Sequence, residues 1–324
     1  MARTRMQPVV WQPPASRTGN PRPLTGLSVI ELDTEGPEDV VLDAQGRIVT
    51  GVKDGRIFRM NPDGSERVQI ADTGGRPLGV ELFPDGRLLV CDAHRGLLAV
   101  DPETGEIQTL TDLTHFCNNA AVAADGVIYF SDTSQRWGMD DWKGDIVEHS
   151  TTGRLLKLVP GGEPEVLIDG LAFANGVALA PDGSWVAVAE TGAYCVRRLW
   201  LTGPKAGTQD MLIDQLDGFP DNMSTGGDGL IWIAMAGPRD AALDWMLSKP
   251  GWLRKIVWAL PEALQPKPQH VIWVLAVDLD GRVVHEFRGD HPKFYFSTGV
   301  REHGGVVFLG SESAPALGSI RIAD

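Results

Sequence analysis

Four oxygen-bearing side chains occupy the same position in copies of one repeated segment. Glu38 opens EDVVLDAQGRIVTG, Asn118 opens NNAAVAADGVIYFSD, Asn175 opens NGVALAPDGSWVAVAE and Asp221 opens DNMSTGGDGLIWIAM. Two carboxylates and two amide oxygens form a hard donor set, which suits Ca²⁺ or Mg²⁺ better than a thiophilic ion. We therefore predict a bound divalent cation, with Ca²⁺ as the first choice and Mg²⁺, Mn²⁺ or Zn²⁺ as alternatives. The chain carries no phosphate-loop or redox-cofactor motif, so we expect no organic cofactor.

Each copy of the segment has the sequence pattern of a β-hairpin. Alternating apolar residues predict one strand, Asp-Gly or Gly-Gly predicts a tight turn, and a second apolar run predicts the partner strand. Two further copies begin at Leu78 and Thr298, and weaker strand pairs follow at 56–71, 96–111 and 153–169. Six copies with four strands each predict an all-β fold, a six-bladed β-propeller. Because the innermost strands line the central channel, the four oxygen donors should converge on it.

The spacing of the copies locates insertions and the closure of the ring. Successive copies start 40, 40, 57, 46 and 77 residues apart, so the third and fifth blades carry insertions at 135–150 and 238–269. The sixth blade lacks an outermost strand, which we expect the run at 24–32 to supply, since an open sheet edge invites aggregation. The predicted organisation is a Pro-rich arm at 1–22 and a single propeller domain at 23–324.

The two insertions are rich in tryptophan. Trp137 and Trp142 lie in the first, and Trp245 lies in the second. Bulky aromatic side chains beside a channel could form an apolar lid that binds substrate. The alternatives are packing on the propeller, contact with another subunit in a homo-oligomer, and contact of the stretch at 252–260 with a membrane surface.

Composition narrows the class of protein. The net charge of −14 argues against nucleic-acid binding, which usually needs a basic surface. Cys91, Cys117 and Cys195 stand singly in apolar runs, without the spacing of a metal site, which favours buried thiols in a reducing compartment. The basic N-terminal stretch has no continuous apolar core, and no segment is long and apolar enough to span a membrane. These features predict a cytoplasmic protein.

Several motifs, in order, resemble the gluconolactonase or senescence-marker-protein superfamily. They are GPED at 36–39, FANGVALAPDG at 173–183 and GFPDNM at 218–223. The stretches at 116–135 and 297–322 are similar to its strictosidine-synthase-like branch, and the resemblance covers roughly 24–322. It implies a six-bladed propeller, a channel cation held by Glu38, Asn118, Asn175 and Asp221, and hydrolysis of lactones or aryl esters. One departure is Asn119, which stands where the superfamily usually has Asp.

The resemblance also implies roles for three further candidates. Asp221 would hold the cation and accept a proton from the attacking water. His115 lies near the expected channel mouth, where the related paraoxonase group uses histidines. Glu302 stands where strictosidine synthases place a catalytic glutamate for condensing an amine with an aldehyde. The alternatives to a lactone or ester hydrolase are therefore carbon–carbon bond formation of that Pictet–Spengler type, and a propeller that only binds a partner.

Overall fold

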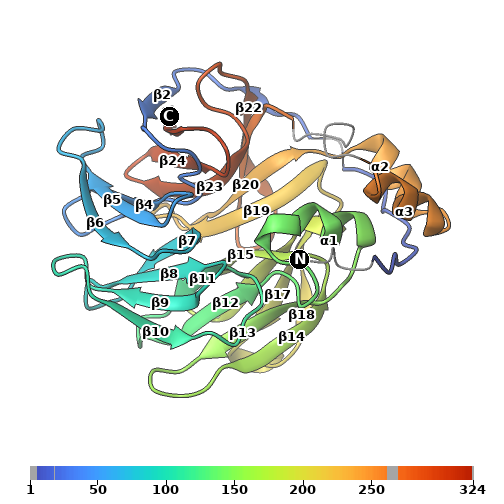
Figure 1. The fold of residues 1–324 in the computed structure, drawn as a ribbon, viewed down its shortest axis with the longest axis horizontal. Coiled ribbons are helices and arrows are strands. Elements are labelled where there is room, and N and C mark those ends of the chain that lie inside the picture. The colour runs from blue at the N-terminus through green and yellow to red at the C-terminus, as the bar shows by residue number, and fades with distance from the viewer. Residues whose placement is uncertain (1–5, 18, 261–268, 323–324) are drawn as a thin grey trace.

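Six antiparallel sheets surround a central axis and form the blades of a β-propeller (Figure 1). The computed structural model describes residues 6–17, 19–260 and 269–322. Blade 1 consists of β3 Val41–Leu42, β4 Ile48–Gly51, β5 Arg56–Met60 and β6 Val68–Asp72. Blade 2 consists of β7 Pro77–Leu82, β8 Leu88–Asp92, β9 Gly96–Val100 and β10 Ile107–Thr111. Blade 3 consists of β11 Cys117–Val122, β12 Ile128–Asp132, β13 Gly153–Leu158 and β14 Glu165–Leu171. The predicted strand pairs at 56–71, 96–111 and 153–169 are confirmed.

The remaining blades follow the same order from the inside outward. Blades 4 and 5 consist of β15 Ala174–Leu179, β16 Trp185–Glu190, β17 Cys195–Trp200 and β18 Gln209–Ile213; and β19 Gly218–Thr225, β20 Ile231–Pro238, β21 Ile272–Val277 and β22 Val283–Gly289. Blade 6 has β23 Ser297–His303, β24 Val306–Ser311 and β25 Ala316–Arg321. The predicted six-bladed propeller is thus confirmed, and the fourth strand of blade 6 comes from the N-terminal part of the chain.

The N-terminal strand closes the ring as predicted. β2 (Ser28–Glu31) pairs antiparallel with β25, with Ser28 opposite Ser319 and Glu31 opposite Ala316, and is the outermost strand of blade 6. The pattern did not indicate a second addition. The two-residue strand β1 (Arg22–Pro23) pairs parallel with β22, so blade 5 gains a fifth strand at its outer edge.

The hairpin turns show why Asp precedes Gly in the repeated segment. Gly126 has a φ of 83°, a conformation that costs little only without a side chain. Asp125 keeps a negative φ and instead accepts a hydrogen bond at its Oδ1 from the backbone N–H of Val127, at 3.1 Å. Equivalent contacts join Asp85 to Arg87, Asp182 to Ser184 and Asp228 to Leu230. Such turns are stabilised by the aspartate side chain.

The hydrophobic core lies between the blades. Six clusters of buried side chains fill the six spaces between neighbouring blades of the described chain. Strand β20 illustrates the two-residue period. Ile231 and Ile233 face blade 4, whereas Trp232 and Ala234 face blade 6. Both faces of β20 are therefore buried, each against a neighbouring blade.

Short helices lie outside the sheets. The first insertion forms the 3-10 turn η1 (Met139–Asp141) and α1 (Trp142–Glu148), and the second forms α2 (Ala241–Leu247) and α3 (Trp252–Trp258). The 3-10 turns η2 (Thr191–Ala193) and η3 (Gly203–Lys205) lie in blade 4. Part of the second predicted insertion, 261–268, lies outside the described residues. Within the described ranges, no helix combines the length and apolar character needed to cross a membrane.

Candidate metal centre and substrate cavity

The four predicted oxygen donors line one cavity at the start of the inner strands. Glu38 precedes β3, and Asn118, Asn175 and Asp221 lie in β11, β15 and β19. Their side chains are only 3–7% exposed, and all four line a cavity of about 210 Å³. Thr298, the equivalent residue of blade 6, lines it as well, whereas Leu78 of blade 2 is buried in a hydrophobic cluster. The repeat therefore brings together the residues that the sequence placed at equivalent positions.

Two amide oxygens in this cavity have no hydrogen-bond partner within the described chain. They are Oδ1 of Asn118 and Oδ1 of Asn175. The other end of the Asn175 side chain is fixed, since its Nδ2 donates to Thr191 Oγ1 at 3.1 Å. Thr191 in turn donates to the carbonyl oxygen of Pro220 at 2.6 Å. A buried acceptor without a partner costs about 1–3 kcal/mol, so these two oxygens fit a bound cation.

The two carboxyl groups are held in an environment that opposes their charge. Burial raises the pKa of Asp221 to about 8, and the negative charge of Glu312 adds to the effect. Burial also raises the pKa of Glu38 well above its usual range, partly offset by the positive charge of Arg76. A cation between the carboxyl groups would favour their charged form. No three His, Cys, Asp or Glu side chains gather at one point in the described residues, so the donor set depends on its amides.

Two residues near the site were missed because they lie outside the repeated position. The guanidinium of Arg76 donates to Glu38 Oε2 at 3.1 Å and to the carbonyl oxygen of Gly36 at 2.8 Å. Arg76 belongs to blade 2, whose copy of the repeated segment opens with Leu78 and not with an oxygen donor. This missing donor is the only sequence signal that could have pointed to Arg76. Glu312 follows β24 and lines the cavity, and its carbonyl oxygen accepts from Arg76 at 3.4 Å.

The residues immediately after the oxygen donors form a second layer in the channel. Polar residues alternate with glycines around the six blades, in the order Asp39, Gly79, Asn119, Gly176, Asn222 and Gly299. The glycines allow close packing: a Cβ on Gly176 would lie 2.4 Å from the carbonyl oxygen of Asp221, and one on Gly299 would lie 2.4 Å from that of Glu38. The glycines thus bring neighbouring inner strands, and the oxygen donors on them, close together.

Asn119 links three blades in this layer. Its Nδ2 donates to Asp39 Oδ2 of blade 1 at 3.2 Å, and its Oδ1 accepts from the backbone N–H of Val177 in blade 4 at 2.8 Å. Asp39 Oδ2 also accepts from the backbone N–H of Val80 in blade 2, at 3.2 Å. Asn119 therefore supports the neighbouring donors without lining the cavity itself.

Above the oxygen donors the cavity wall is largely apolar. Phe116, Phe173, Phe219 and Phe296 come from the blades, Met139, Trp142, Ile146 and Val147 come from the first insertion, and Leu243, Met246, Val257 and Trp258 come from the second. Lys143, Asp240 and Gln269 are polar residues of the same wall. A ligand in this cavity would meet oxygen donors at one end and hydrocarbon around the rest.

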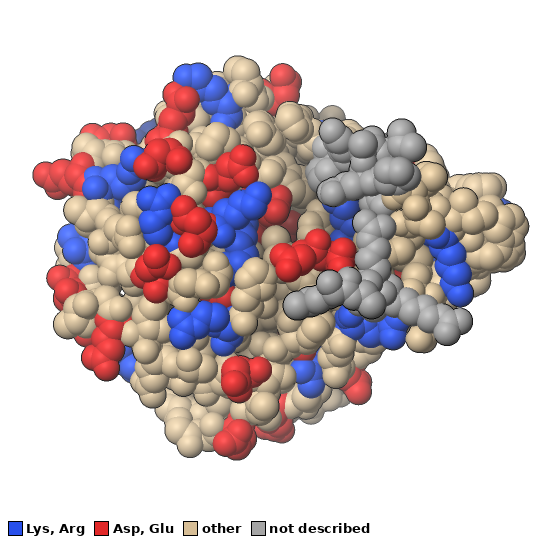
Figure 2. Space-filling model, in the orientation of Figure 1, with Lys and Arg blue, Asp and Glu red and all other residues tan. Residues whose placement is uncertain are grey.

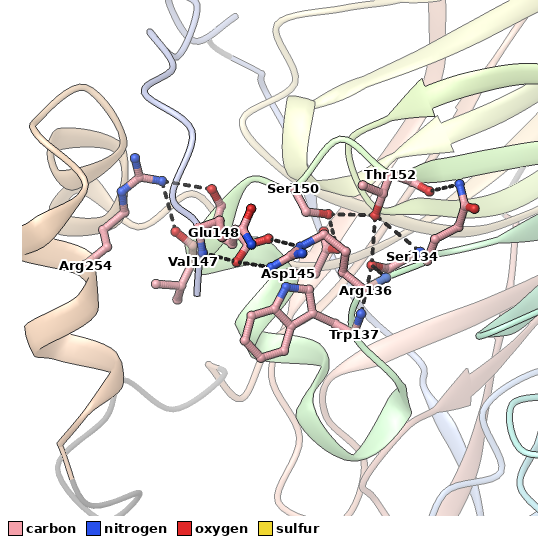
Figure 3. A network of polar contacts seen from close by, with 11 residues as sticks. Ser134, Arg136, Trp137, Asp145, Val147, Glu148, Ser150, Thr152 and Arg254 are labelled. Atoms are coloured by element: carbon pink, nitrogen blue, oxygen red, sulfur yellow. Dashed lines mark hydrogen bonds and ion pairs between the residues drawn. The ribbon is translucent and has the colours of Figure 1, made fainter. Parts of the chain in front are cut away.

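The two insertions and the N-terminal arm are tied together over the cavity (Figure 3). Buried Arg254 of α3 donates to the carbonyl oxygens of Val147 and Glu148 in the first insertion, at 3.0 and 3.1 Å, and to that of Val9 in the arm, at 2.7 Å. The carboxylate of Glu148 pairs with Arg136 at 2.5 Å. The two insertions therefore pack against each other and also line the cavity with their inner faces. Packing and a lid over the cavity, which the sequence offered as alternatives, are compatible in these segments.

The described part of the N-terminal arm is hydrogen-bonded to both insertions. The backbone N–H of Val9 donates to the carbonyl oxygen of Glu148 at 2.9 Å, and that of Trp11 donates to Leu247 at 3.0 Å. The Trp11 ring stacks on His149 with a centroid distance of 4.3 Å. Burial lowers the pKa of His149 to about 4, so this stack contains a neutral imidazole at neutral pH.

The other predicted site residues divide between the cavity and elsewhere. Trp142 lines the cavity. Trp137 is buried and packs edge-on against Trp258, with centroids 5.3 Å apart, whereas Trp245 is 56% exposed on α2. Neither is among the cavity-lining residues.

His115 and Glu302 also lie outside the cavity wall. His115 is exposed, and its backbone N–H donates to Asp132 Oδ1 at 3.1 Å. Glu302 is buried near the end of β23 and accepts from the backbone N–H groups of Asp228 and Gly305, at 3.1 and 2.8 Å. Thr298 of the same strand does line the cavity, and four residues of a strand span about 13 Å. The geometry thus gives neither residue a contact with the cavity.

Comparison with known proteins identifies the family. The strictosidine synthase family model matches residues 118–204, and the model for the N-terminal part of strictosidine synthase-like proteins matches 22–60. A strictosidine synthase-like protein of Arabidopsis thaliana is 33% identical over 306 residues, which cover 90% of this chain and 81% of that protein. The chain belongs to the strictosidine synthase-like family. Human adipocyte plasma membrane-associated protein, a further relative, is 30% identical over 96% of this chain and 82% of its own length.

Two solved structures have the same propeller fold as this chain. A gluconolactonase of Xanthomonas campestris superposes with a TM-score of 0.66 at 17% identity, covering 92% of this chain and 89% of that one. The calcium-binding protein regucalcin of Agrobacterium tumefaciens superposes with a TM-score of 0.63 at 13% identity, covering 90% and 91%. At this level of sequence identity, the comparison shows a shared fold alone.

Proposed function

We propose that this chain is a divalent-cation-dependent hydrolase that opens lactones or cleaves esters carrying an apolar group. The observation that carries the proposal is the pair of unpartnered amide oxygens, on Asn118 and Asn175, in the same buried cavity as the carboxyl groups of Glu38 and Asp221. These four residues would hold the cation, for which Ca²⁺ fits the all-oxygen donor set best. The gluconolactonase and the calcium-binding protein of the same fold support this reading.

The residues of the chain have separable roles in such a reaction. A cation bound at these oxygens supplies Lewis-acid polarisation of the substrate carbonyl. Asp221 accepts the proton of the attacking water at its carboxylate oxygen, and a cation beside it would keep this carboxyl group charged and able to accept. Phe116, Phe173 and Trp142 hold the apolar part of the substrate and exclude bulk water around it. Arg76 fixes the orientation of Glu38.

The two other candidate functions receive less support from the geometry. A condensation that depends on Glu302 would require this carboxylate in the cavity, and it is held by backbone N–H groups outside the cavity wall. A propeller that only binds a partner would not require unpartnered donors in a buried, apolar-walled cavity.

The test combines cation content with turnover. We expect one Ca²⁺ per chain by atomic emission, hydrolysis of an apolar lactone or aryl ester that is abolished by chelator and restored by Ca²⁺, and a loss of about 100-fold or more in kcat for Asp221→Asn. His115→Ala, a substitution outside the cavity, should keep the activity. A preparation without cation and without turnover would favour a binding protein, and amine–aldehyde condensation lost in Glu302→Gln would favour the family's synthase chemistry.

A further inference from the structure

The outer face of the α2–α3 hairpin exposes large apolar side chains. Trp245, Trp252 and Ile256 are 56%, 59% and 56% exposed. The chain has ten tryptophans, and the other eight are buried or half-buried. Val10 of the arm, which runs beside the hairpin, is also 55% exposed. Large exposed apolar surface gathered at one place marks an interaction site.

The exposure of this face is not a result of loose packing. The inner face of the same helices is fully used: Leu247 is buried, Arg254 is buried and bonded to Val9 and to the first insertion, and Met246 and Val257 line the cavity. Asp240 caps α2 by accepting from the backbone N–H of Leu243 at 2.8 Å. The hairpin is therefore fixed in place and presents its outer tryptophans without needing them for the fold.

The charges on this face indicate the kind of partner. Lys255 is exposed on α3, and the ammonium group of Lys249 lies 5.5 Å from the ring centre of Trp245. The one acidic residue of the two helices, Asp244, is turned inward, where it accepts from the Tyr194 hydroxyl at 2.7 Å. Figure 1 shows the hairpin projecting beyond the blades, and Figure 2 shows its outer end as mostly uncharged surface crossed by basic side chains. A chain with a net charge of −14 thus presents a locally basic, aromatic surface.

We propose that the α2–α3 hairpin docks this protein onto the surface of an anionic lipid membrane. Tryptophan rings favour the boundary between headgroups and acyl chains, and lysine ammonium groups beside them favour anionic headgroups. Docking brings Trp245, Trp252 and Ile256 into the boundary and leaves the propeller in water. Because the opposite faces of the same helices line the cavity, docking also places the cavity wall next to the lipid. This inference concerns binding and stands independently of the proposed hydrolysis.

Vesicle binding tests the proposal. We expect the full chain to sediment with vesicles of phosphatidylcholine containing about 30% phosphatidylserine at about 0.15 M salt, and to bind vesicles of phosphatidylcholine alone at least ~10-fold more weakly. Trp245→Ser with Trp252→Ser should weaken binding to the anionic vesicles by ~10-fold or more. Val283→Ser with Val284→Ser, which alters two exposed apolar residues on β22, is the matched control and should bind as the parent does.

A charge-matched pair tests the basic residues separately. Lys249→Glu with Lys255→Glu should weaken binding, since each lysine near an anionic surface contributes roughly fivefold. Lys53→Glu with Lys205→Glu makes the same change in net charge at exposed lysines elsewhere and should have a much smaller effect. Circular dichroism confirms that each variant is folded.

Three outcomes would overturn the proposal. The first is that the parent chain binds neither kind of vesicle, and the second is that hairpin and control variants bind the anionic vesicles equally. The third is a dimer in size-exclusion chromatography that Trp245→Ser with Trp252→Ser dissociates, without vesicle binding by the parent. This last result would assign the face to a second copy of the chain.

Discussion

Asn119 donates its side-chain amide to the carboxyl group of Asp39 across 3.2 Å, joining blade 3 to blade 1 one layer behind the oxygen donors. Both side chains are almost fully buried, and burial raises the pKa of Asp39 to about 6. An aspartate at position 119 would place a second carboxyl group at hydrogen-bond distance from the first. Asn119 therefore supplies a donor where an aspartate could donate only when protonated.

Asn119→Asp should destabilise the protein in a pH-dependent way. At pH 8 the lost hydrogen bond and the repulsion between buried carboxylates should lower the free energy of unfolding by about 1–3 kcal/mol. At pH 5.5 a shared proton restores a donor, so the loss should shrink. Urea unfolding at both pH values measures this, and Asp39→Asn with Asn119→Asp, which exchanges acceptor and donor, should recover part of the stability. An equal loss at both pH values would contradict this account.

Chelator-treated protein should lose stability as the pH rises from about 4 to about 8. Burial raises the pKa of Asp221 to about 8, above the unfolded value near 4. Its contribution is therefore fully present below the unfolded pKa and is lost as the pH rises through the folded one. A single group of this kind contributes a slope of at most about 1.4 kcal/mol per pH unit. Thermal unfolding from pH 5 to pH 8.5 should show this decline, and Asp221→Asn should make it shallower, since the raised pKa values of Asp39 and Glu38 contribute the rest.

Ca²⁺ should reduce the same decline, because the cation takes the place of the proton at Asp221. Parallel pH profiles for the parent chain and Asp221→Asn would show that this carboxyl group does not titrate as the structure indicates. Parallel profiles with and without Ca²⁺ would show that the cation does not bind at Asp221.

Arg76→Met should destabilise the cation-free protein strongly. The substitution leaves Glu38 buried without its cationic partner, and breaking a buried ion pair on one side costs about 3–5 kcal/mol. Adding Glu38→Gln should recover part of this loss, since the uncompensated charge is then removed. Arg87→Met, which breaks the exposed pair with Asp85 on the same blade, should cost less than about 1 kcal/mol. Urea unfolding compares the three, and equal losses for Arg76→Met and Arg87→Met would contradict the role given to Arg76.

Trp142→Ala should change substrate preference rather than abolish turnover. Removing this ring from the cavity wall should lower kcat/KM about 10-fold or more for substrates with a large apolar group, with a smaller effect on short-chain substrates. Trp245→Ala, on the outer face of the second insertion, is the matched control and should leave the preference unchanged with soluble substrates. Steady-state kinetics on a graded series of esters checks this. A uniform loss across the series would show that Trp142 supports the fold and not specificity.

The repeated segment was enough to predict the fold and the convergence of the oxygen donors. Glu38, Asn118, Asn175 and Asp221 hold one position in successive blades, and rotation about a common axis must bring equivalent positions together. Closure by residues 24–32 followed from the missing strand of blade 6. These predictions succeeded because they depend on local pattern and on symmetry.

The rest of the site depends on contacts that break the repeat. Arg76 reaches Glu38 from the blade that lacks an oxygen donor, and Glu312 enters the cavity from a turn after β24. Trp142 of α1 faces the cavity, whereas Trp137, in the loop before η1, packs against Trp258. No sequence period distinguishes two residues in a loop and a short helix. The path of the arm is fixed by Arg254, which is distant in sequence.

The most direct test of the metal centre is the anomalous scattering of a crystal grown with Ca²⁺. We predict one strong anomalous peak in the channel, coordinated by oxygens of Glu38, Asn118, Asn175 and Asp221, and its loss in crystals of Asp221→Asn. A channel without a peak, or a peak held by other residues, would contradict the central claim that these four side chains form a cation site.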